Sequence, residues 1–226
     1  MTAAITAARL GKSVLLIERN ERLGRKLAIT GKGRCNVTNN CSVEEALANV
    51  PRNAKFLYGA FAKFPPSETM AFFEELGVPL KTERGKRVFP VSDKAGDVVA
   101  ALERELRRLD VKIAREKALS LIIDDNACRG VKTSAGEHFA RSVIVAAGGK
   151  SYPKTGSDGS GYALAKQAGH TVIEPAPSLV PLVTEEKWVK SACGLTLKNT
   201  AMKLLDREKA VYEDFGEVAF TADGLG

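Results

Sequence analysis

The sequence is poor in the residues that build metal centres and disulfide-linked folds. Among its 226 residues there are only two histidines and four cysteines, and no two cysteines form a CxxC pair. No histidine is placed to complete a zinc site, so we expect no metal. We expect reduced thiols, typical of a cytoplasmic protein, at all four positions: Cys35, Cys41, Cys128 and Cys193.

Long apolar segments and a secretory signal are also lacking. No apolar run approaches the ~18 residues of a membrane span. The N-terminal segment MTAAITAARLGKSVLLIE has no basic region followed by an apolar core. We therefore expect no membrane association. A hydrophobic share of 44% and a charged share of 27% fit a globular protein of one large or two small domains.

Aromatic residues are scarce, which weakens the interpretation that the basic charge serves to bind nucleic acid. The formal net charge of +7 permits nucleic acid or an acidic ligand as partner. Aromatics make up only 6% of the chain, so stacking platforms for bases are few, and no nucleic-acid module signature is present. Much of the excess charge lies in two local stretches, 23–40 and 81–87. Nucleic acid is therefore an unfavoured partner.

The stretch Leu23–Asn40, LGRKLAITGKGRCNVTNN, combines four basic side chains with three glycines. It has too few apolar residues for a core segment and too many glycines for a stable helix. Glycine lets backbone N–H groups approach a phosphate closely, and arginine and lysine add charge-assisted hydrogen bonds. The stretch alone leaves two interpretations open, an anion-binding loop and a solvated basic loop.

The segment before this stretch favours the interpretation that the stretch binds a nucleotide. A helix is predicted over Thr2–Leu10 with Gly11 as its C-cap, then a buried strand over Ser13–Glu18 that ends in an acid. This is the order of the second half of a βαβ unit, where the terminal acid holds a ribose hydroxyl. The GxGxxG turn expected immediately before Met1 is absent, so we expect the first strand and dinucleotide loop to be lacking. An unrelated α/β fold with a genuine N-terminal helix is the alternative.

Helical periodicity dominates the next part of the chain. Ser42 is the predicted N-cap of one helix, and Ser67 that of another after two prolines. A strand, a basic turn and a second strand are predicted over 78–90. The predicted helices are 43–50, 53–64, 67–77 and 95–109.

From Val111 the apolar pattern changes to a period of two. It predicts a small meander, VKIARE, LSLIIDD, CRGVKTS and EHFARS, that returns to a buried strand over Val143–Ala147. A glycine loop and a helix follow, and the N-terminus of this helix is a second candidate for binding a phosphate. Three prolines between 175 and 181 mark a linker, beyond which strand-like segments suggest a second module.

Several motifs together resemble one family. The segments KLAITGKGRCNVTN, GVPLKTERGKRVFPVSDKA and VIVAAGGKSYPKTGSDGSGYALAKQAGH are similar, in this order, to bacterial NAD(P)/FAD-dependent oxidoreductases that include aminoacetone oxidases and 3-dehydro-bile acid reductases. The first motif is highly specific to this family, whereas AAGG is shared by many flavoproteins. The resemblance implies an α/β fold: a partial Rossmann-like FAD-binding domain with a small β-meander over 1–178, and the start of an inserted β-rich module over 179–226. It also implies a fragment truncated at both ends.

The resemblance assigns cofactor-binding residues. Glu18 would bind the adenosine ribose, and Leu119 would offer a backbone contact near the adenine. Gly148 and Gly149 would lie against the dinucleotide. The pyrophosphate and flavin side would be lined by Lys26, Thr30, Gly31, Gly33, Arg34, Cys35 and Asn36.

The cysteine in this set has a second interpretation. Arg34 and Lys32 lie next to Cys35 in the sequence, and such cations lower the pKa of a thiol. A redox thiol is therefore an alternative to a packing or flavin-contact role. No catalytic acid or base is assigned, because His138 and His170 are expected to be structural or surface residues.

These assignments predict an FAD-dependent oxidoreductase that transfers hydride through the flavin on a small organic substrate. NAD(P)H is a candidate reductant. Two alternatives stay open: a basic protein that binds nucleic acid through Arg25–Arg34, and an inactive flavoprotein fragment. The sequence decides neither the oligomeric state nor between oxidase and reductase.

Overall fold

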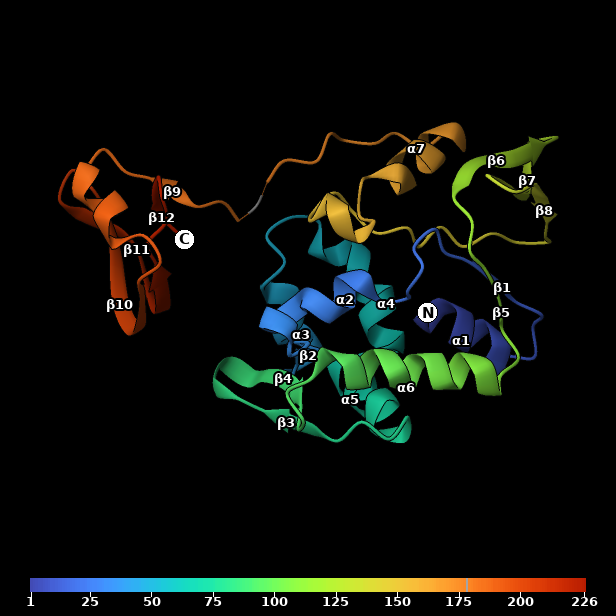
Figure 1. Ribbon diagram of the computed structural model, residues 1–226, viewed down its shortest axis with the longest axis horizontal. Helices are drawn as coiled ribbons and strands as arrows, with labels where there is room; N and C mark the ends of the chain where they lie inside the picture. Colours follow the sequence, from blue (N-terminus) through green and yellow to red (C-terminus); the bar gives the residue numbers. More distant parts are fainter. Residues whose placement is uncertain (178) are drawn as a thin grey trace. The chain divides into compact units, whose positions relative to one another are not determined.

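The alanine-rich start of the chain folds as α1 (Thr2–Arg9), and the apolar segment after it folds as β1 (Leu15–Ile17), which confirms both predictions. Gly11 lies in the turn between them with a φ of 73°, a conformation that glycine adopts at little cost. The computed structural model describes residues 1–177 and 179–226. Its contacts divide the chain into two units, Met1–Ile173 and Glu174–Gly226 (Figure 1).

A parallel strand pair organises the first unit. β1 pairs with β5 (Lys112–Ala114), from Leu15 opposite Lys112 to Ile17 opposite Ala114. The ladder continues at Glu18, whose N–H donates to the carbonyl of Ala114 at 3.0 Å. Parallel strands joined through helices are the α/β, Rossmann-like arrangement that we expected. The prediction that VKIARE belongs to the meander is wrong, because its strand pairs with β1, far away in the sequence.

Helix α1 and the helices between β1 and β5 enclose the main core. Figure 1 shows α6 (Ala95–Arg108) running beside α1, and the buried side chains of both helices, including Ile5, Val98, Leu102 and Leu106, meet in one cluster. The segment 78–90 forms the predicted hairpin, which β2 extends to a three-stranded sheet in the order β2-β4-β3. The elements of this region are α2 (Arg25–Ile29), β2 (Thr38–Asn39), α3 (Val43–Ala48), α4 (Tyr58–Lys63), α5 (Pro66–Glu75), β3 (Leu80–Thr82), β4 (Arg87–Pro90) and α6 (Ala95–Arg108).

Two predictions in this region are wrong in detail. The basic glycine-rich stretch holds a short helix, α2, because its glycines lie on either side of Arg25–Ile29 and leave that segment free to turn. Helix α5 begins at Pro66 and not after a Ser67 cap. Proline suits the first position of a helix, since the N–H that it lacks would have no partner there.

The meander contains β6 (Ala118–Asp124), β7 (Ala127–Thr133) and β8 (Glu137–Phe139). Asp125 and Asn126 make the first turn with φ of 45° and 56°, as a two-residue hairpin turn requires. The strand predicted over 143–147 does not form. Among the described residues this segment has no partner strand to supply ladder hydrogen bonds, and Ile144 is 66% exposed.

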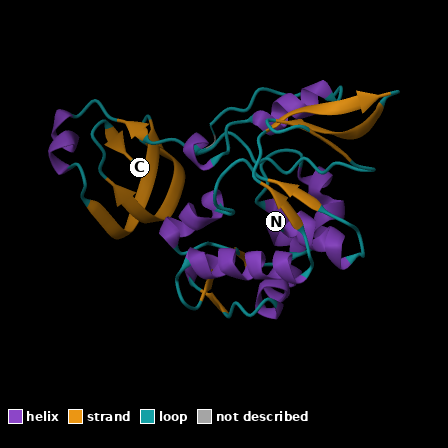
Figure 2. Cartoon of the chain, turned by 45° about the vertical axis from the view of Figure 1, so that its right-hand side comes forward, coloured by secondary structure: helices purple, strands orange, loops and turns teal. Residues whose placement is uncertain are grey.

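The second unit is built mainly from strands, with a short 3-10 helix over Lys187–Ala192. Its main element is a long hairpin of β10 (Thr196–Asp206) and β11 (Lys209–Ala219) (Figure 2). The short strands β9 (Leu182–Val183) and β12 (Gly224–Leu225) pair with each other in an antiparallel manner. This confirms the strand-like character predicted beyond the prolines. The predicted domain boundary involves residue 178, which lies outside the described residues. Across the part of the chain that is described, no helix is both long and apolar enough to cross a membrane.

Candidate functional site

Two segments that are distant in the sequence meet where β1 ends. One is Glu18–Lys26, and the other is the glycine-rich loop 148–160 before α7 (Ser160–Gln167). We call this region the Glu18 edge. Arg19 joins the two segments, since its guanidinium donates to Asp158 Oδ2 and to the carbonyl of Gly156, each at 2.7 Å. Asn20 adds a bond of 3.3 Å from Nδ2 to the carbonyl of Thr155.

Glu18 occupies the position that the predicted ribose-binding acid requires. It follows β1 directly and is partly buried. Its Oε1 accepts from the backbone N–H of Asn20 at 2.8 Å and from Asn20 Nδ2 at 2.7 Å. Its Oε2 accepts no hydrogen bond from the residues that the structure describes. A carboxylate with one oxygen held and the other open can accept from a ribose hydroxyl.

The other end of the loop is closed by a carboxylate. Asp158 Oδ1 accepts from the N–H of Ser160 at 3.0 Å, in the first turn of α7. The Arg19 guanidinium, with the Ser160 N–H, holds the pKa of Asp158 well below its usual range. The N-terminus of α7 therefore already has an anion. The expectation that it binds a phosphate is not supported by this geometry.

Three further predicted residues lie in or beside the same loop. Gly148 has a φ of 79°, and a methyl group added there would lie 3.1 Å from Ser157 Oγ. The carbonyl of Gly149 accepts from the N–H of Gly159 at 3.0 Å. Lys26 Nζ donates to the carbonyl of Ser151 at 2.7 Å. The structure thus brings Glu18, Lys26, Gly148 and Gly149 to one region.

Leu119 lies on β6 and is 51% exposed. The pairing of β6 with β7 shifts register between Ala118 and Ser120, so Leu119 lies at an irregularity of the ladder. Ala118 packs in the same small hydrophobic cluster as Ile17, the last residue of β1. The backbone contact of Leu119 with adenine stays a prediction.

A second group of predicted residues lies against the β2-β4-β3 sheet, around a set of charges that we call the Arg34 network. This network consists of Arg34, Lys81, Glu83 and Asp93. Arg34 Nη2 lies 2.7 Å from Glu83 Oε2, and its Nε lies 3.0 Å from Asp93 Oδ1 without hydrogen-bond geometry. Its guanidinium also stacks over the ring of Phe89, 4.0 Å from the centroid. The Arg34 side chain is therefore held by protein groups.

The structure disfavours the redox alternative for Cys35 and agrees with a packing role. Its side chain is fully buried, and burial raises the pKa of the thiol, an effect that the Thr30 hydroxyl only partly offsets. A thiol whose pKa is raised is a poor nucleophile at neutral pH, which disfavours the redox-thiol alternative. The four cysteines are all free thiols.

The rest of the basic stretch has mainly local roles. Thr30 Oγ1 donates to the carbonyl of Leu27 at 2.7 Å. Gly31 has a φ of 56°, and a methyl group there would lie 2.9 Å from the Phe89 ring. Oriented with its nitrogen toward two backbone carbonyls, the Asn36 amide donates to Thr38 at 2.9 Å. Gly33, with a φ of 86°, has open space beside it. Open backbone of this kind can approach a ligand closely.

The donors present at the Glu18 edge fit a dinucleotide. The edge offers a carboxylate with an open oxygen that can accept from a hydroxyl pair, an ammonium group that can donate to phosphate, and close-packed glycines. The sequence missed Arg19, Asn20 and Asp158, which hold this edge together. No motif distinguishes them, because the contacts that join the two segments link residues more than a hundred positions apart. Within the described ranges, no cluster of three or more His, Cys, Asp or Glu side chains could hold a metal ion.

Two open grooves lie along α6, outside the Glu18 edge. One, of about 320 Å³, is lined by charged residues that include Arg9 and Glu105, and the other, of about 450 Å³, includes Pro79 and Pro90. Neither is lined by a residue predicted to bind cofactor.

Comparison with known proteins gives consistent similarities. Residues 1–220 match a family model described as the HI0933-like protein Rossmann domain. The chain is 38% identical over 231 residues to a 3-dehydro-bile acid delta(4,6)-reductase of Clostridium scindens, covering 100% of this chain and 54% of the relative. It is 28% identical over 229 residues to a ribosomal RNA dihydrouridine synthase of Haemophilus influenzae, covering 98% and 55%. A protein of the same name from Escherichia coli is 26% identical over 181 residues, covering 80% and 44%. The chain spans about half the length of these curated relatives.

Proposed function

Because the chain belongs to the HI0933-like Rossmann-domain family, we propose that it is an FAD-dependent oxidoreductase that acts on a small organic substrate. The observation that carries this proposal is the Glu18 edge. A carboxylate at the end of a parallel strand keeps one oxygen open beside a close-packed glycine loop, which suits the adenosine ribose of a dinucleotide.

The three charged residues among those predicted have defined tasks in this proposal. Glu18 would accept from the ribose hydroxyls, and Lys26 would meet the phosphates by leaving the carbonyl of Ser151. Arg34 would reach a phosphate only by leaving Glu83 and Asp93. We therefore assign it first a structural role, in which its ion pairs stabilise the stretch that packs against the β2-β4-β3 sheet. FAD, when bound, supplies the hydride chemistry, and the protein supplies binding and orientation.

We propose that the reaction runs as a reduction, with NAD(P)H as the electron source in the cytoplasm. One relative is named a reductase, and two are named synthases of dihydrouridine, the hydrogenated form of uridine. These names support a reductase over an oxidase. They also support a second candidate substrate, a base in RNA, which the net charge of +7 would help to attract.

The test is the visible absorption spectrum of the purified chain before and after addition of FAD and desalting. We expect a retained flavin band that NADH or NADPH bleaches without oxygen. A Glu18→Ala variant should retain less flavin. A chain that is colourless after excess FAD has been added and removed by desalting contradicts the proposal.

The same spectroscopic experiment distinguishes the two candidate substrates. The bleached protein is mixed without oxygen either with an unsaturated 3-oxo steroid or with ribosomal RNA. Return of the flavin band with the steroid alone supports the small-molecule substrate. Return of the band with RNA alone supports the second candidate.

A further inference from the structure

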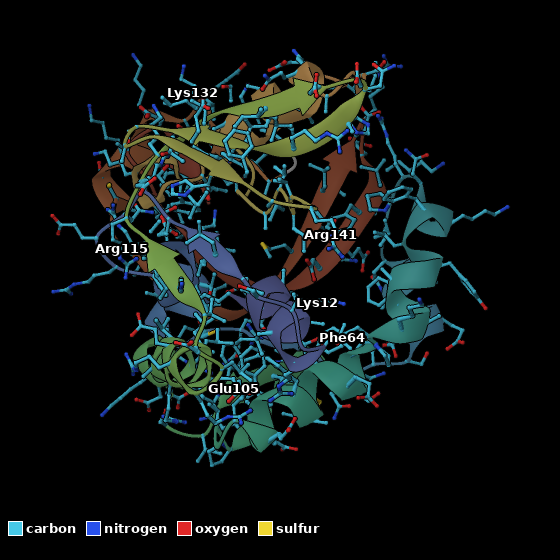
Figure 3. All side chains as sticks on the ribbon, turned by 90° about the vertical axis from the view of Figure 1, so that its right-hand side faces the viewer. Lys12, Phe64, Glu105, Arg115, Lys132 and Arg141 are labelled. Carbon is cyan, nitrogen blue, oxygen red and sulfur yellow. The ribbon has the colours of Figure 1, made fainter. Side chains whose placement is uncertain are left out.

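Asn20 has more polar contacts at the Glu18 edge than the sequence suggests. Its backbone N–H and its Nδ2 both donate to Glu18 Oε1, and Nδ2 also donates to the carbonyl of Thr155. Its Oδ1 accepts from Arg25 Nη1 at 2.9 Å. Its carbonyl accepts from the Nη1 of Arg115, labelled in Figure 3, at 3.3 Å. All its polar groups are therefore engaged.

These contacts determine the orientation of the Glu18 carboxylate. Two N–H groups on one oxygen hold the side chain in a single rotamer and leave Oε2 as the open atom. Without the Asn20 amide, the carboxylate would rotate among several positions and would lose entropy on binding a hydroxyl pair.

The glycine loop supports this arrangement by its close approach. A methyl group added at Gly156 would lie 2.7 Å from Asn20 Nδ2, so the loop backbone packs directly on the amide. Gly156 also has a φ of 106°, which side-chain-bearing residues rarely adopt. The amide is thus held between the loop on one side and the guanidinium of Arg25 on the other.

We propose that Asn20 is the positioning residue of the ribose site and acts on the dinucleotide only through Glu18. This inference rests on the proposed function and deepens it. It differs from a purely structural role, in which Asn20 would serve only to tie the loop 148–160 to β1. Arg19 makes that kind of tie through Asp158 and Gly156 without an observed bond to the Glu18 side chain.

The test measures the binding of FAD and of FMN to the full chain through the quenching of flavin fluorescence. FMN lacks the adenosine ribose, so it does not report on Glu18. We expect Asn20→Ala and Glu18→Ala each to weaken FAD binding roughly tenfold. Both should leave FMN binding within about twofold of the unchanged protein. The double variant should bind FAD no more than about twofold more weakly than Glu18→Ala alone, because the two residues act as one unit.

Arg19→Ala is the matched control. It loosens the same two segments, and its effect should add to that of Glu18→Ala. Equal losses of FAD and FMN binding in Asn20→Ala, or losses that add to those of Glu18→Ala, would show a structural role and overturn the proposal. If the unchanged chain bound FAD but Glu18→Ala had no effect, the positioning role would fail while the flavin site stood. If the unchanged chain bound no FAD, the proposed function would fail as well.

Asn20→Asp covers the case in which the alanine variant does not fold. The aspartate keeps the size of the side chain and the acceptor for Arg25, but it replaces the donor with a carboxylate beside Glu18. The new carboxylate repels Glu18 and no longer donates to its Oε1. FAD binding by this variant should therefore be at least as weak as that of Asn20→Ala, while FMN binding stays within about twofold of the unchanged protein. FAD binding as tight as that of the unchanged chain would overturn the proposal.

Discussion

Glu105 shows how a single residue can acquire an unusual environment. It lies on the buried side of α6, and Figure 3 labels it there. Its carboxylate accepts from Arg108 Nε at 2.7 Å and from Arg9 Nη2 at 2.8 Å. The hydrogen bonds from Arg108, followed by those from Arg9, lower the pKa of Glu105 to about 2 against the opposing effect of burial. A charge that is only 7% exposed is thus stabilised by two guanidinium groups.

Glu105→Gln is expected to lower the free energy of unfolding by about 2–3 kcal/mol at neutral pH. The carboxyl has a lower pKa in the folded state, so its contribution is present above its unfolded pKa of about 4.5. The contribution is lost as pH falls toward about 2. Urea unfolding at several pH values measures this change.

Glu75→Gln is the control for this prediction. Glu75 pairs with the same Arg9 at 3.2 Å, but its side chain is 65% exposed, so the loss should stay below about 1 kcal/mol. A Glu105→Gln deficit that stays constant across the acid range would show that packing, and not charge, sets the contribution of Glu105.

At the scale of elements, the Glu18 edge depends on how closely a loop approaches a strand. β1 alone is three residues long, and one partner strand, β5, supports it. The loop 148–160 holds the residues after β1 through Arg19, Asn20 and the backbone of Gly156. The position of Glu18 therefore depends on packing between elements as much as on its place at the end of a strand.

Gly156→Ala should destabilise the first unit by about 2–3 kcal/mol, since it combines a strained φ with a contact of 2.7 Å to Asn20 Nδ2. Gly169→Ala is the matched control. Gly169 also has a positive φ, 85°, but no atom lies within 4 Å of the added methyl group, so only the backbone term of about 1 kcal/mol should appear. Equal losses measured by thermal unfolding would show that the loop can retreat from Asn20.

At the scale of the whole molecule, the predicted cofactor residues all belong to the first unit, Met1–Ile173. Both hydrophobic clusters of the chain's described core lie in this unit as well. The second unit consists mainly of a hairpin, and several of its apolar side chains, such as Leu204 and Tyr212, are more than half exposed. The proposed cofactor site and both hydrophobic clusters therefore belong to the first unit.

A chain that ends at Ile173 should bind FAD within about threefold of the full chain. The measurement is the same titration of flavin fluorescence, with circular dichroism to confirm that the shortened chain is folded. A loss of more than about tenfold in a folded protein would show that residues 174–226 contribute to the cofactor site.

The sequence by itself determined the elements that depend on local interactions. Alanine content and apolar periodicity predicted α1 and α6, and the Asp125-Asn126 pair predicted its turn, because propensity and amphipathic spacing act over a few residues. The place of Glu18 at the end of β1 followed from the same signals, and the resemblance named the family.

Only the tertiary structure decided which distant segments meet. It paired β5 with β1, brought Arg19 and Asn20 to the loop 148–160, and placed Arg34 between Glu83 and Asp93. Burial raises the pKa of the Cys35 thiol, the opposite of the lowering that the redox-thiol alternative required. Pairing partners and desolvation depend on contacts between residues far apart in the chain, so no local pattern could predict them.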